Sequence, residues 1–294
     1  CYIIILFFIF SCQSKSSRHY KNTIKESSVS TIKKSSSKID LRKETFSLVT
    51  WNIQDLGRSK NGEEIVAIAK IIKDYDIIAI QEIVGKDPAG IKAVAKIVDE
   101  LNRLGAKWDY RVSNPTKSPS SNMSERYGFL WKTSKVSIKG KPKLDDKLED
   151  LCYREPFIGE FNLKGKSNTI RIINYHARKH NDKPEEEIIY LKDYQKRFRS
   201  NNLIICGDFN LNEKHAVWDG FYKKGFINAL SNTATTLKIK CKSGSYLNHS
   251  IDNIFYTNST KVIESGSIDF VKFCKNLADA RKLSDHLPAY IKFQ

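Results

Sequence analysis

The stretch 203–210, Leu-Ile-Ile-Cys-Gly-Asp-Phe-Asn, constrains the fold of this chain more than any other. Four apolar residues run into a glycine, and a carboxylate and a carboxamide follow two residues apart. Period-two alternation of an extended chain puts Asp208 and Asn210 on one side and Phe209 on the other. Such a strand delivers polar groups to the rim of a sheet. The same pattern is also common where a strand simply ends in a turn, so its meaning depends on the rest of the chain.

Length and charge limit the possible classes of protein. A chain of 294 residues with 40% apolar residues forms one large domain or two small ones. It carries 50 Lys and Arg against 33 Asp and Glu, a net charge of +17. This excess favours a polyanionic partner, either nucleic acid or an anionic lipid surface. The alternative is a general compositional bias toward Lys, Ile, Asn and Ser.

The first twelve residues have the pattern of an export signal. Residues 2–10, YIIILFFIF, are too few to span a bilayer but suit the apolar core of a signal peptide. Ser11-Cys12 then resembles a bacterial lipoprotein signal, with Cys12 as the lipidated residue, and an ordinary cleaved secretory signal is the alternative. We expect an exported lipoprotein, held by its lipid to the membrane in the periplasm or at the cell surface, or otherwise a secreted protein.

Residues 13–45 differ in composition from the rest of the chain. They hold nine Ser, nine Lys or Arg and three Asp or Glu, a net charge of +6 that leaves +11 for the remainder. A segment with so little to bury is expected to be a disordered tether. Residues 46–294 show no internal linker or repeat and are expected to form the catalytic domain.

Four of the six cysteines lie in that domain, at positions 152, 206, 241 and 274. Their wide spacing and the absence of a CxxC pair exclude zinc-ribbon and thioredoxin motifs. An exported chain could form disulfides among them, but the sequence assigns no pair. Cys206 lies within an apolar run, which favours a buried thiol.

Strands and helices alternate along the domain. Amphipathic spacing predicts helices over residues 63–73, 88–104 and 184–200. Short apolar and β-branched runs predict strands at 46–53, 76–80, 108–113, 126–132, 135–138, 155–161, 169–175, 203–206, 250–256 and 289–293. This interleaving favours a layered α/β domain with two mixed sheets.

Polar residues recur at the ends of these strands: Asn52, Glu82, His176, Asp208, Asn210, Asp252, Asp285 and His286. Each one alone has a simple alternative as a turn former, a helix cap or a surface residue. Together they supply hard oxygen ligands for Mg²⁺ or Ca²⁺ and two histidines for acid–base catalysis. The sequence contains no Cys/His zinc cluster and no P-loop. This combination favours metal-assisted attack of water on a phosphate ester.

The same residues carry a family resemblance. In order, WNIQ (51–54), IQE (80–82), NYH (174–176), GDFN (207–210), SIDNIF (250–255) and SDHLP (284–288) resemble the motif series of the endonuclease/exonuclease/phosphatase superfamily. SERYGFLWK (124–132) and YREPFI (153–158) resemble its deoxyribonuclease I-like branch. The resemblance covers residues 46–294. It implies a four-layer α/β/β/α sandwich with two central mixed sheets.

The resemblance also implies a role for each matching residue. Glu82, Asn52 and Asp285 match divalent-metal positions. Asp208 and Asn210 match the pair that orients the water and the scissile phosphate. Two histidine–carboxylate pairs manage the protons, and two residues bind the substrate phosphate. The pairs are His286 with Asp252 and His176 with Glu125, and the phosphate-binding residues are Arg154 and Asn174.

The function implied is an exported endonuclease that cleaves DNA, or alternatively RNA, with low sequence specificity. Its cofactor would be Mg²⁺, with Mn²⁺ or Ca²⁺ as alternatives, and we expect a monomer. The alternative is another phosphoester hydrolase on the same scaffold, either a sphingomyelinase-like phospholipase C or an inositol-phosphate phosphatase. Two substrate contacts depart from the family pattern, because Gln54 replaces an arginine and Met123 a tyrosine. Lys86, Lys117 and Lys179 could compensate, or could simply be solvated surface.

Overall fold

The computed structural model describes residues 44–86, 88–120 and 123–294. The predicted signal peptide, its Cys12 and the tether up to residue 43 lie outside the described residues. Within the described ranges, no helix is both long and apolar enough to cross a membrane.

The first of two large sheets has six strands in the order β14-β15-β1-β2-β4-β3. Strands β1 and β2 are parallel and the other neighbours antiparallel, so the sheet is mixed. The strands are β1 (Phe46–Leu56), β2 (Ile77–Val84), β3 (Trp108–Val112), β4 (Glu125–Lys132), β14 (Val262–Ser267) and β15 (Ala289–Phe293).

The second sheet has the order β10-β13-β9-β8-β7-β5, with β6 paired to β7. Only β8 and β9 run parallel among its paired strands. The strands are β5 (Val136–Ile138), β6 (Lys143–Leu144), β7 (Phe157–Leu163), β8 (Thr169–His176), β9 (Leu203–Asp208), β10 (Phe226–Asn228) and β13 (Asp252–Thr257). A separate hairpin pairs β11 (Leu237–Lys242) with β12 (Ser245–Leu247).

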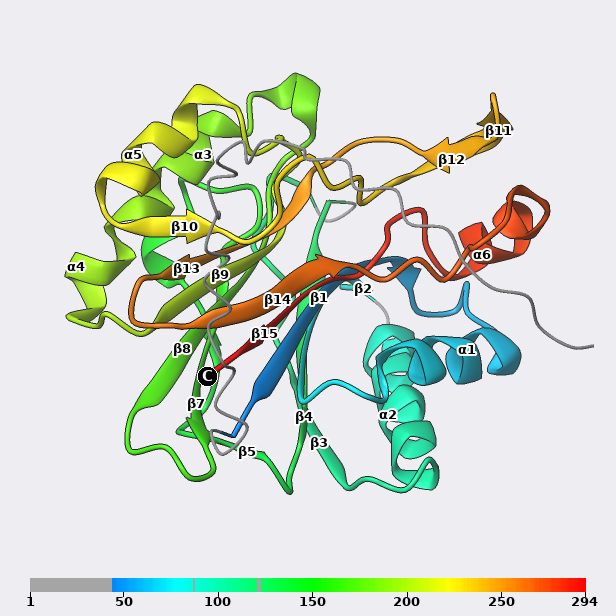
Figure 1. Ribbon diagram of the computed structural model, residues 1–294, viewed down its shortest axis with the longest axis horizontal. Helices are drawn as coiled ribbons and strands as arrows, with labels where there is room; N and C mark the ends of the chain where they lie inside the picture. The colour runs from blue at the N-terminus through cyan, green and yellow to red at the C-terminus, as the bar shows by residue number, and fades with distance from the viewer. Residues whose placement is uncertain (1–43, 87, 121–122) are drawn as a thin grey trace, which may run out of the picture. The chain divides into compact units, whose positions relative to one another are not determined.

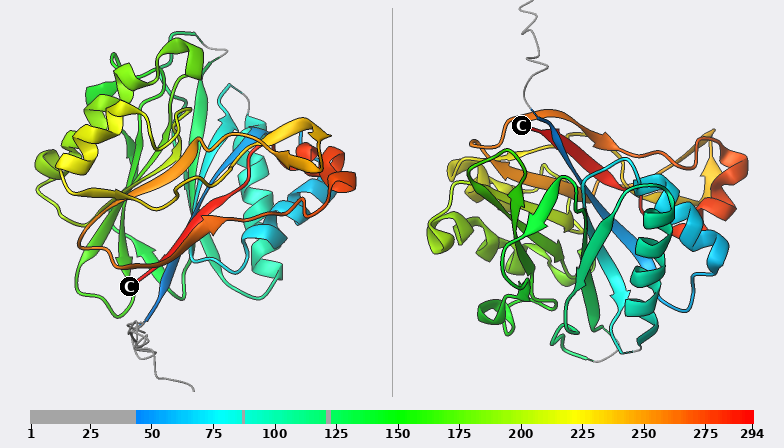
Figure 2. Two further views of the ribbon diagram at one scale, coloured as in Figure 1. Left: turned by 45° about the horizontal axis from the view of Figure 1, so that its top comes forward. Right: turned by 90° about the horizontal axis from the view of Figure 1, so that it is seen from below.

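Helices cover the outer faces of the two sheets (Figures 1 and 2). Helices α1 (Gly62–Ile72) and α2 (Pro88–Arg103) pack on the first sheet, and α3 (Glu185–Ile188), α4 (Tyr194–Phe198) and α5 (Asp219–Lys223) flank the second. Helix α6 (Leu277–Leu283) lies beside the β11–β12 hairpin. The predicted four-layer α/β/β/α sandwich with two mixed sheets is confirmed.

The apolar run of β9 shows why strands in the middle of this sandwich are apolar on both faces. Ile204 and Cys206 belong to the core between the two sheets, whereas Leu203 and Ile205 pack against the helical layer outside. A strand buried on both faces has no polar alternation until it reaches the rim of the sheet. Phe209 joins the outer core, so Asp208 is left facing inward, as the alternation predicts.

One predicted helix is wrong in form. Residues 184–200 form α3, a 3₁₀ segment at Ile189–Asp193 and then α4, instead of one continuous helix. The buried residues Ile188, Leu191 and Tyr194 repeat every three positions. A 3₁₀ helix has three residues per turn and puts all of them on one face, so packing against the sheet selects it over the α-helix.

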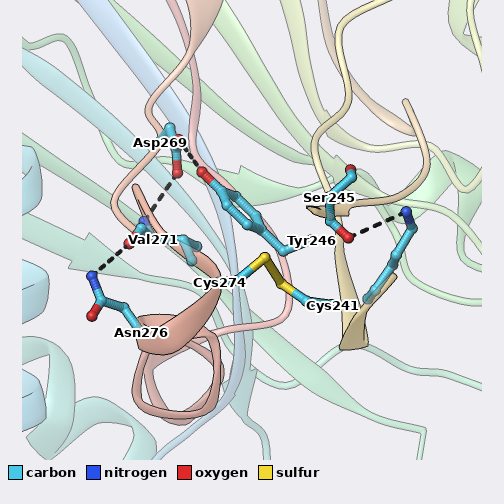
Figure 3. Close-up of a disulfide and its surroundings, with 8 residues drawn as sticks. Cys241, Ser245, Tyr246, Asp269, Val271, Cys274 and Asn276 are labelled. Carbon is cyan, nitrogen blue, oxygen red and sulfur yellow. Dashed lines mark hydrogen bonds between the residues drawn. A yellow bond between two sulfur atoms is a disulfide. The ribbon is translucent and has the colours of Figure 1, made fainter. Parts of the chain in front are cut away.

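One disulfide joins Cys241 of β11 to Cys274, which begins a 3₁₀ turn before α6 (Figure 3). The sequence could not assign this pair because 33 residues separate the two cysteines. Cys152 and Cys206 are free and buried. The prediction of a buried thiol at Cys206 is therefore confirmed.

Gly207 lets β9 approach β8 more closely than any other residue would allow. Its φ is +144°, and a Cβ at this position would lie 1.8 Å from the carbonyl oxygen of Tyr175. We expect Gly207→Ala to destabilise the protein by about 3 kcal/mol or more, because a forbidden φ and a backbone clash add. Gly62→Ala is the control, since its Cβ would meet nothing within 4 Å. Urea unfolding measures both variants, and equal stability would contradict the close approach.

Candidate active site

The polar residues of the site continue side-chain columns that face the space between the two sheets. On β1, Leu48 belongs to the inter-sheet core and Asn52 lies four residues further along the same face. On β9, Cys206 precedes Asp208 in the same way. Columns on β8, β4 and β13 bring three more polar residues to the inter-sheet face: His176, Glu125 and Asp252. In the sheet register, both His176 and Asp252 are partners of Asp208. The rim of the sheet therefore carries an acidic and imidazole row.

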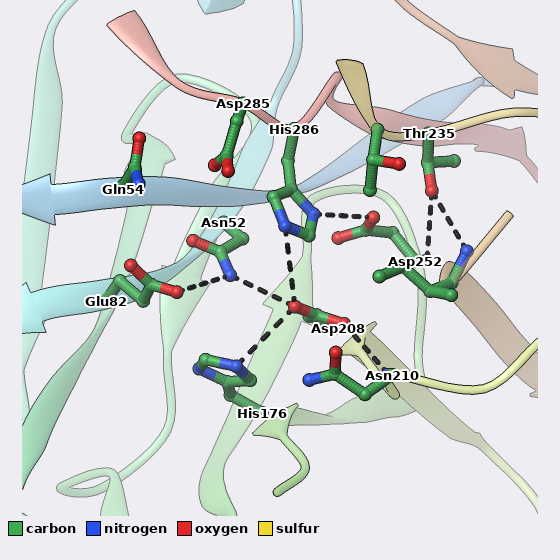
Figure 4. A network of polar contacts seen from close by, with 12 residues as sticks. Asn52, Gln54, Glu82, His176, Asp208, Asn210, Thr235, Asp252, Asp285 and His286 are labelled. Carbon is green, nitrogen blue, oxygen red and sulfur yellow. Dashed lines mark hydrogen bonds and ion pairs between the residues drawn. The ribbon is translucent and has the colours of Figure 1, made fainter. Parts of the chain in front are cut away.

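Asp208 lies between two histidines (Figure 4). Its Oδ2 atom is 3.5 Å from Nε2 of His176 and 3.7 Å from Nε2 of His286. Each imidazole is held from behind by another carboxylate. The Nδ1 of His176 lies 3.0 Å from both oxygens of Glu125, and the Nδ1 of His286 lies 2.9 Å from Oδ2 of Asp252. Both Nε2 atoms are therefore directed toward Asp208.

His286 comes from the loop before β15, and several contacts fix it. Its backbone carbonyl accepts a hydrogen bond from the Trp51 indole at 2.8 Å, and its amide donates to Ser284 Oγ at 3.0 Å. Ser284 in turn donates to the carbonyl of Asn52 at 2.7 Å. Ser284 thus ties the histidine to β1. Sequence reasoning gave this serine no role, although it lies inside the SDHLP motif.

Thr235 is a second supporting residue that sequence reasoning missed. Its hydroxyl accepts hydrogen bonds from the amides of Asp252 and Ile251, at 3.0 and 3.2 Å. These bonds fix the start of β13 and so the carboxylate behind His286. A buried threonine in the run NTATT carries no distinguishing sequence signal, because its partners lie more than 15 residues away along the chain.

Asn52 and Glu82 form the part of the site that fits a cation. The Asn52 amide donates to Oε1 of Glu82 at 2.9 Å and to Oδ2 of Asp208 at 3.1 Å. Its Oδ1 atom is buried and has no hydrogen-bond partner among the described residues. A divalent cation beside the Glu82 carboxylate would satisfy this oxygen, and such a hard oxygen set suits Mg²⁺. Asp285, the third predicted metal position, lines the same cleft.

Glu82 reaches this position through an irregular backbone. Its φ is +58°, and the pairing of β2 with both β1 and β4 shifts register around it. A β-bulge of this kind turns one side chain out of the strict alternation. The backbone amide of Asp55 then donates to Glu82 Oε2 at 3.3 Å.

Asp208, Asp252 and His286 form a second group with close ligand atoms, all within 4.8 Å of one another. We regard this group as a proton-handling cluster instead of a metal site. The facing atoms of His286 and Asp252 are at hydrogen-bond distance, 2.9 Å, and a proton between them already satisfies both. The free Asn52 oxygen favours the Glu82 side for the cation.

Arg154 is buried behind His176. Its Nε donates to the carbonyl of His176 at 3.2 Å and its Nη2 to the carbonyl of Ala177 at 2.6 Å. Nε also lies 3.6 Å from Oε2 of Glu125. Arg154 lines the cleft, where it brings positive charge, and it also positions the His176–Glu125 pair.

Asn174 does not fit the role of a phosphate ligand and is a correction to the sequence prediction. Its amide donates to the carbonyls of Ile80 and Gly128, at 3.0 and 3.1 Å, and its oxygen accepts from Gln81 at 2.5 Å. The residue is fully buried. All of these partners belong to the first sheet, so Asn174 joins the two sheets beneath the site. It stands one step before the rim, since it is two residues before His176 on β8.

Asn210 lies beyond the end of β9 in the left-handed region, at φ +52°. Its amide nitrogen accepts the constraint of the turn by donating to Asp208 Oδ1 at 2.9 Å. Its side chain donates to the carbonyl of Ala177 at 3.2 Å. Asn210 is thus placed beside Asp208 by the turn and not by strand alternation.

These residues line an open cleft of about 710 Å³. Gln54 and Met123, the two departures from the family pattern, both lie on its wall. Lys86 and Lys179 also line it, whereas Lys117 lies elsewhere and pairs with Glu149 and Asp150. The predicted compensation by lysines is therefore sterically open to only two of the three.

The charges within the His176–Glu125 pair stabilise each other. Burial by itself disfavours the Glu125 carboxylate, but His176 and Arg154 outweigh it, and the pKa of Glu125 falls below its usual value. Burial and Arg154 would lower the pKa of His176, but Glu125 and Asp208 outweigh them and raise it. The pair therefore favours an imidazolium next to a carboxylate.

The second pair behaves in the same way. Burial would lower the pKa of His286, but Asp252 and Asp208 raise it to about 10. Burial and the neighbouring Asp208 raise the pKa of Asp252 to about 6, against the opposing effect of His286. Because the two groups titrate together, the charged pair is the stable form at neutral pH.

Sequence comparisons match the chain to one family and to deoxyribonucleases. The model described as Endonuclease/Exonuclease/phosphatase family matches residues 49–286. Deoxyribonuclease-1-like 1 of Cricetulus griseus is 28% identical over 172 residues, covering 57% of this chain and 55% of that protein. The match thus spans about half the length of that relative. Deoxyribonuclease gamma of Rattus norvegicus is 26% identical over 265 residues, covering 84% of each.

Solved structures share the fold. An endonuclease/exonuclease/phosphatase family protein from Bacteroides thetaiotaomicron superposes with a TM-score of 0.61 at 17% identity, covering 85% of this chain and 97% of that one. The mannosyl-6-phosphatase Bt3783 of the same organism gives 0.59 at 16% identity, covering 85% and 99%. At these identities the likeness establishes the fold alone.

The raised pKa of His286 predicts how Asp252→Asn behaves. A histidine with a raised folded pKa contributes stability below its unfolded value of about 6.5, and this is lost as pH rises through about 10. We expect Asp252→Asn to lower the His286 pKa by at least about one unit. The stability gap between variant and wild type should narrow from pH 7 to above pH 10. NMR titration of the metal-free proteins measures the shift, and an unchanged His286 pKa would contradict the pairing.

Proposed function

Because the chain belongs to the endonuclease/exonuclease/phosphatase family, we propose that it is a divalent-metal-dependent endonuclease that hydrolyses DNA with little sequence specificity. The observation that carries the proposal is the convergence of two carboxylate-backed imidazoles on Asp208, beside the Asn52–Glu82 pair. The deoxyribonuclease relatives support DNA as the substrate. The net charge of +17 is consistent with binding to a phosphate backbone.

The geometry suggests how the residues divide the work. Asp208, assisted by Asn210, orients the attacking water and accepts its proton as the new P–O bond forms. The opposite P–O bond breaks, and an imidazole donates a proton to the leaving oxygen. His286 and His176 are both placed for this task, since their Nε2 atoms face the same space. Glu125 and Asp252 hold the rings in position and stabilise their positive charge.

Arg154 and the cation would stabilise the phosphate. The guanidinium brings a buried positive charge to the wall of the cleft next to His176. When bound at Glu82 and Asn52, with Asp285 nearby, a divalent cation would supply Lewis-acid stabilisation of the phosphoryl oxygens. We propose Mg²⁺, with Mn²⁺ or Ca²⁺ as alternatives.

We also propose that the protein is exported and anchored through a lipid at Cys12. The apolar stretch 2–10 followed by Ser11-Cys12 supports this. The Cys241–Cys274 disulfide adds support, because structural disulfides persist in oxidising compartments.

The anchor predicts a lipidated protein in the membrane fraction of cells that express the full chain with its native leader. Mass spectrometry should find acyl groups on Cys12 and none in a Cys12→Ser protein. An unmodified Cys12 in a mature protein released to the medium would replace the anchor with ordinary secretion.

The proposed chemistry predicts that the protein nicks supercoiled plasmid with Mg²⁺ and that EDTA stops it. His176→Ala and His286→Ala should each slow nicking by at least about 100-fold, the usual effect of losing an acid–base catalyst. His215→Asn is the control, because His215 lies outside the cleft and caps a 3₁₀ turn that Asn also caps. Circular dichroism checks that every variant is folded.

The same assay separates the alternatives on this scaffold. Plasmid, RNA, sphingomyelin and an inositol phosphate are offered to the wild-type protein in parallel. Intact plasmid together with hydrolysis of one of the last two would overturn the nuclease in favour of a phospholipase C or phosphatase. Full nicking activity in either histidine variant would remove that histidine from the mechanism.

A further inference from the structure

The β11–β12 hairpin carries a group of lysines that the cleavage chemistry does not use. We name these residues the lysine arm: Lys238, Lys240 and Lys242 on β11, with Lys272 and Lys275 on the segment joined to it by the Cys241–Cys274 disulfide. Figures 1 and 2 show the hairpin projecting beyond the two sheets, next to α6.

The arm is positive because little in it neutralises the lysines. Residues 235–251 contain no Asp or Glu. Among the described residues, no carboxylate lies within ion-pair distance of the five lysines, whereas Lys292 and Lys139 elsewhere pair with Glu264 and Glu160. The acid of the linked segment, Asp269, is engaged by the Tyr246 hydroxyl and by two backbone amides (Figure 3).

The arm is joined directly to the active-site segment. Thr236 and His286 form an antiparallel bridge. The amide of Leu237 donates to the carbonyl of Asp285 at 2.8 Å, and the amide of Leu287 donates to the carbonyl of Thr235 at 2.7 Å. β11 therefore begins where the wall of the cleft ends.

Several contacts fix the direction of the arm. Leu237 packs with Val271, Leu277 and Leu287 in a small core at its base. Arg281 donates to the carbonyl of Leu237 at 3.0 Å. The disulfide then holds the strand at Cys241. The lysines are thus presented on a supported strand, which reduces the entropy lost on binding.

The dimensions match a DNA duplex that continues past the cleft. The six residues of β11 extend about 20 Å at roughly 3.3 Å each, the length of about six base pairs. The cleft itself, about 710 Å³, has the size of a site for one small ligand. A long duplex cleaved there must therefore lie on neighbouring surface, and the arm is the basic surface attached to the cleft wall.

We propose that the lysine arm binds the phosphate backbone of duplex DNA outside the cleft and so makes extended duplexes the preferred substrate. This inference rests on the proposed nuclease function. An anionic membrane is the other partner to consider, since Ile239 is 80% exposed and Phe273 62% exposed. Two apolar side chains give little area for insertion into a bilayer, and the attachment to the catalytic segment favours DNA.

The test compares two triple variants of the full protein. The arm variant is Lys238→Gln, Lys240→Gln and Lys242→Gln. The control variant is Lys141→Gln, Lys143→Gln and Lys164→Gln, which makes the same charge change at exposed lysines outside both the cleft and the arm. The substrates are a duplex of about 40 base pairs, which can reach cleft and arm together, and a hairpin with a stem of about six base pairs, which cannot.

We expect the arm variant to raise KM for the long duplex by about tenfold or more at 0.1 M salt, with kcat unchanged, because each lost phosphate contact removes close to one counterion. The slope of log affinity against log salt should fall in magnitude by about two to three. Kinetics on the short hairpin should match wild type. Equal KM and salt slope in the arm and control variants would overturn the proposal.

Binding measured without cleavage keeps this test separate from the proposed function. Fluorescence anisotropy of the labelled duplex in EDTA reports the arm even if the protein proves not to cut DNA. Weaker binding by the arm variant alone supports the arm, whatever the catalytic result. Vesicles of phosphatidylglycerol are the third probe. Loss of vesicle binding in the arm variant with unchanged DNA binding would assign the surface to a membrane and overturn the proposal.

Discussion

The arrangement of the site depends on one carboxylate, Asp208, held at the rim between two sheets. Its position follows from strand register, because β8, β9 and β13 place His176, Asp208 and Asp252 in one row. A buried anion is costly unless it has partners. Here two imidazoles and the Asn52 amide surround it, and each imidazole needs a carboxylate of its own. The network of alternating charge is thus a consequence of burying the first acid.

The sandwich makes that burial possible by bringing two sheets together and then letting them separate. Below the site, Asn174 of one sheet bonds to Gln81 and to two carbonyls of the other. Directly above, Gly207 allows β9 to lie against Tyr175, and the bulge at Glu82 turns a second acid toward the gap. Irregular backbone is concentrated where the chemistry is placed, as expected when a scaffold of regular strands presents a site at its edge.

The fold alone does not select the substrate, since a mannosyl-6-phosphatase and nuclease-family proteins share it. Selection must come from surfaces around the conserved type of cleft. In this chain the wall contains Gln54 and Met123, neither of which supplies positive charge. The lysine arm, stapled by a disulfide and continuous with the catalytic loop, offers charge at a different place. Low sequence specificity is the natural result when binding rests on phosphates instead of base edges.

The sequence by itself determined the layered α/β class, the strand at 289–293 and the residue types at the strand ends, because apolar periodicity and motif order are local properties. It also identified ten site residues that the fold brings to the rim. Only the tertiary structure decided the others. Asn174 binds sheet to sheet, Thr235 and Ser284 act as supports, residues 184–200 follow a 3₁₀ path, and Cys241 pairs with Cys274. Each of these depends on a partner distant in the chain, and sequence spacing carries no information about distances that only strand pairing and packing create.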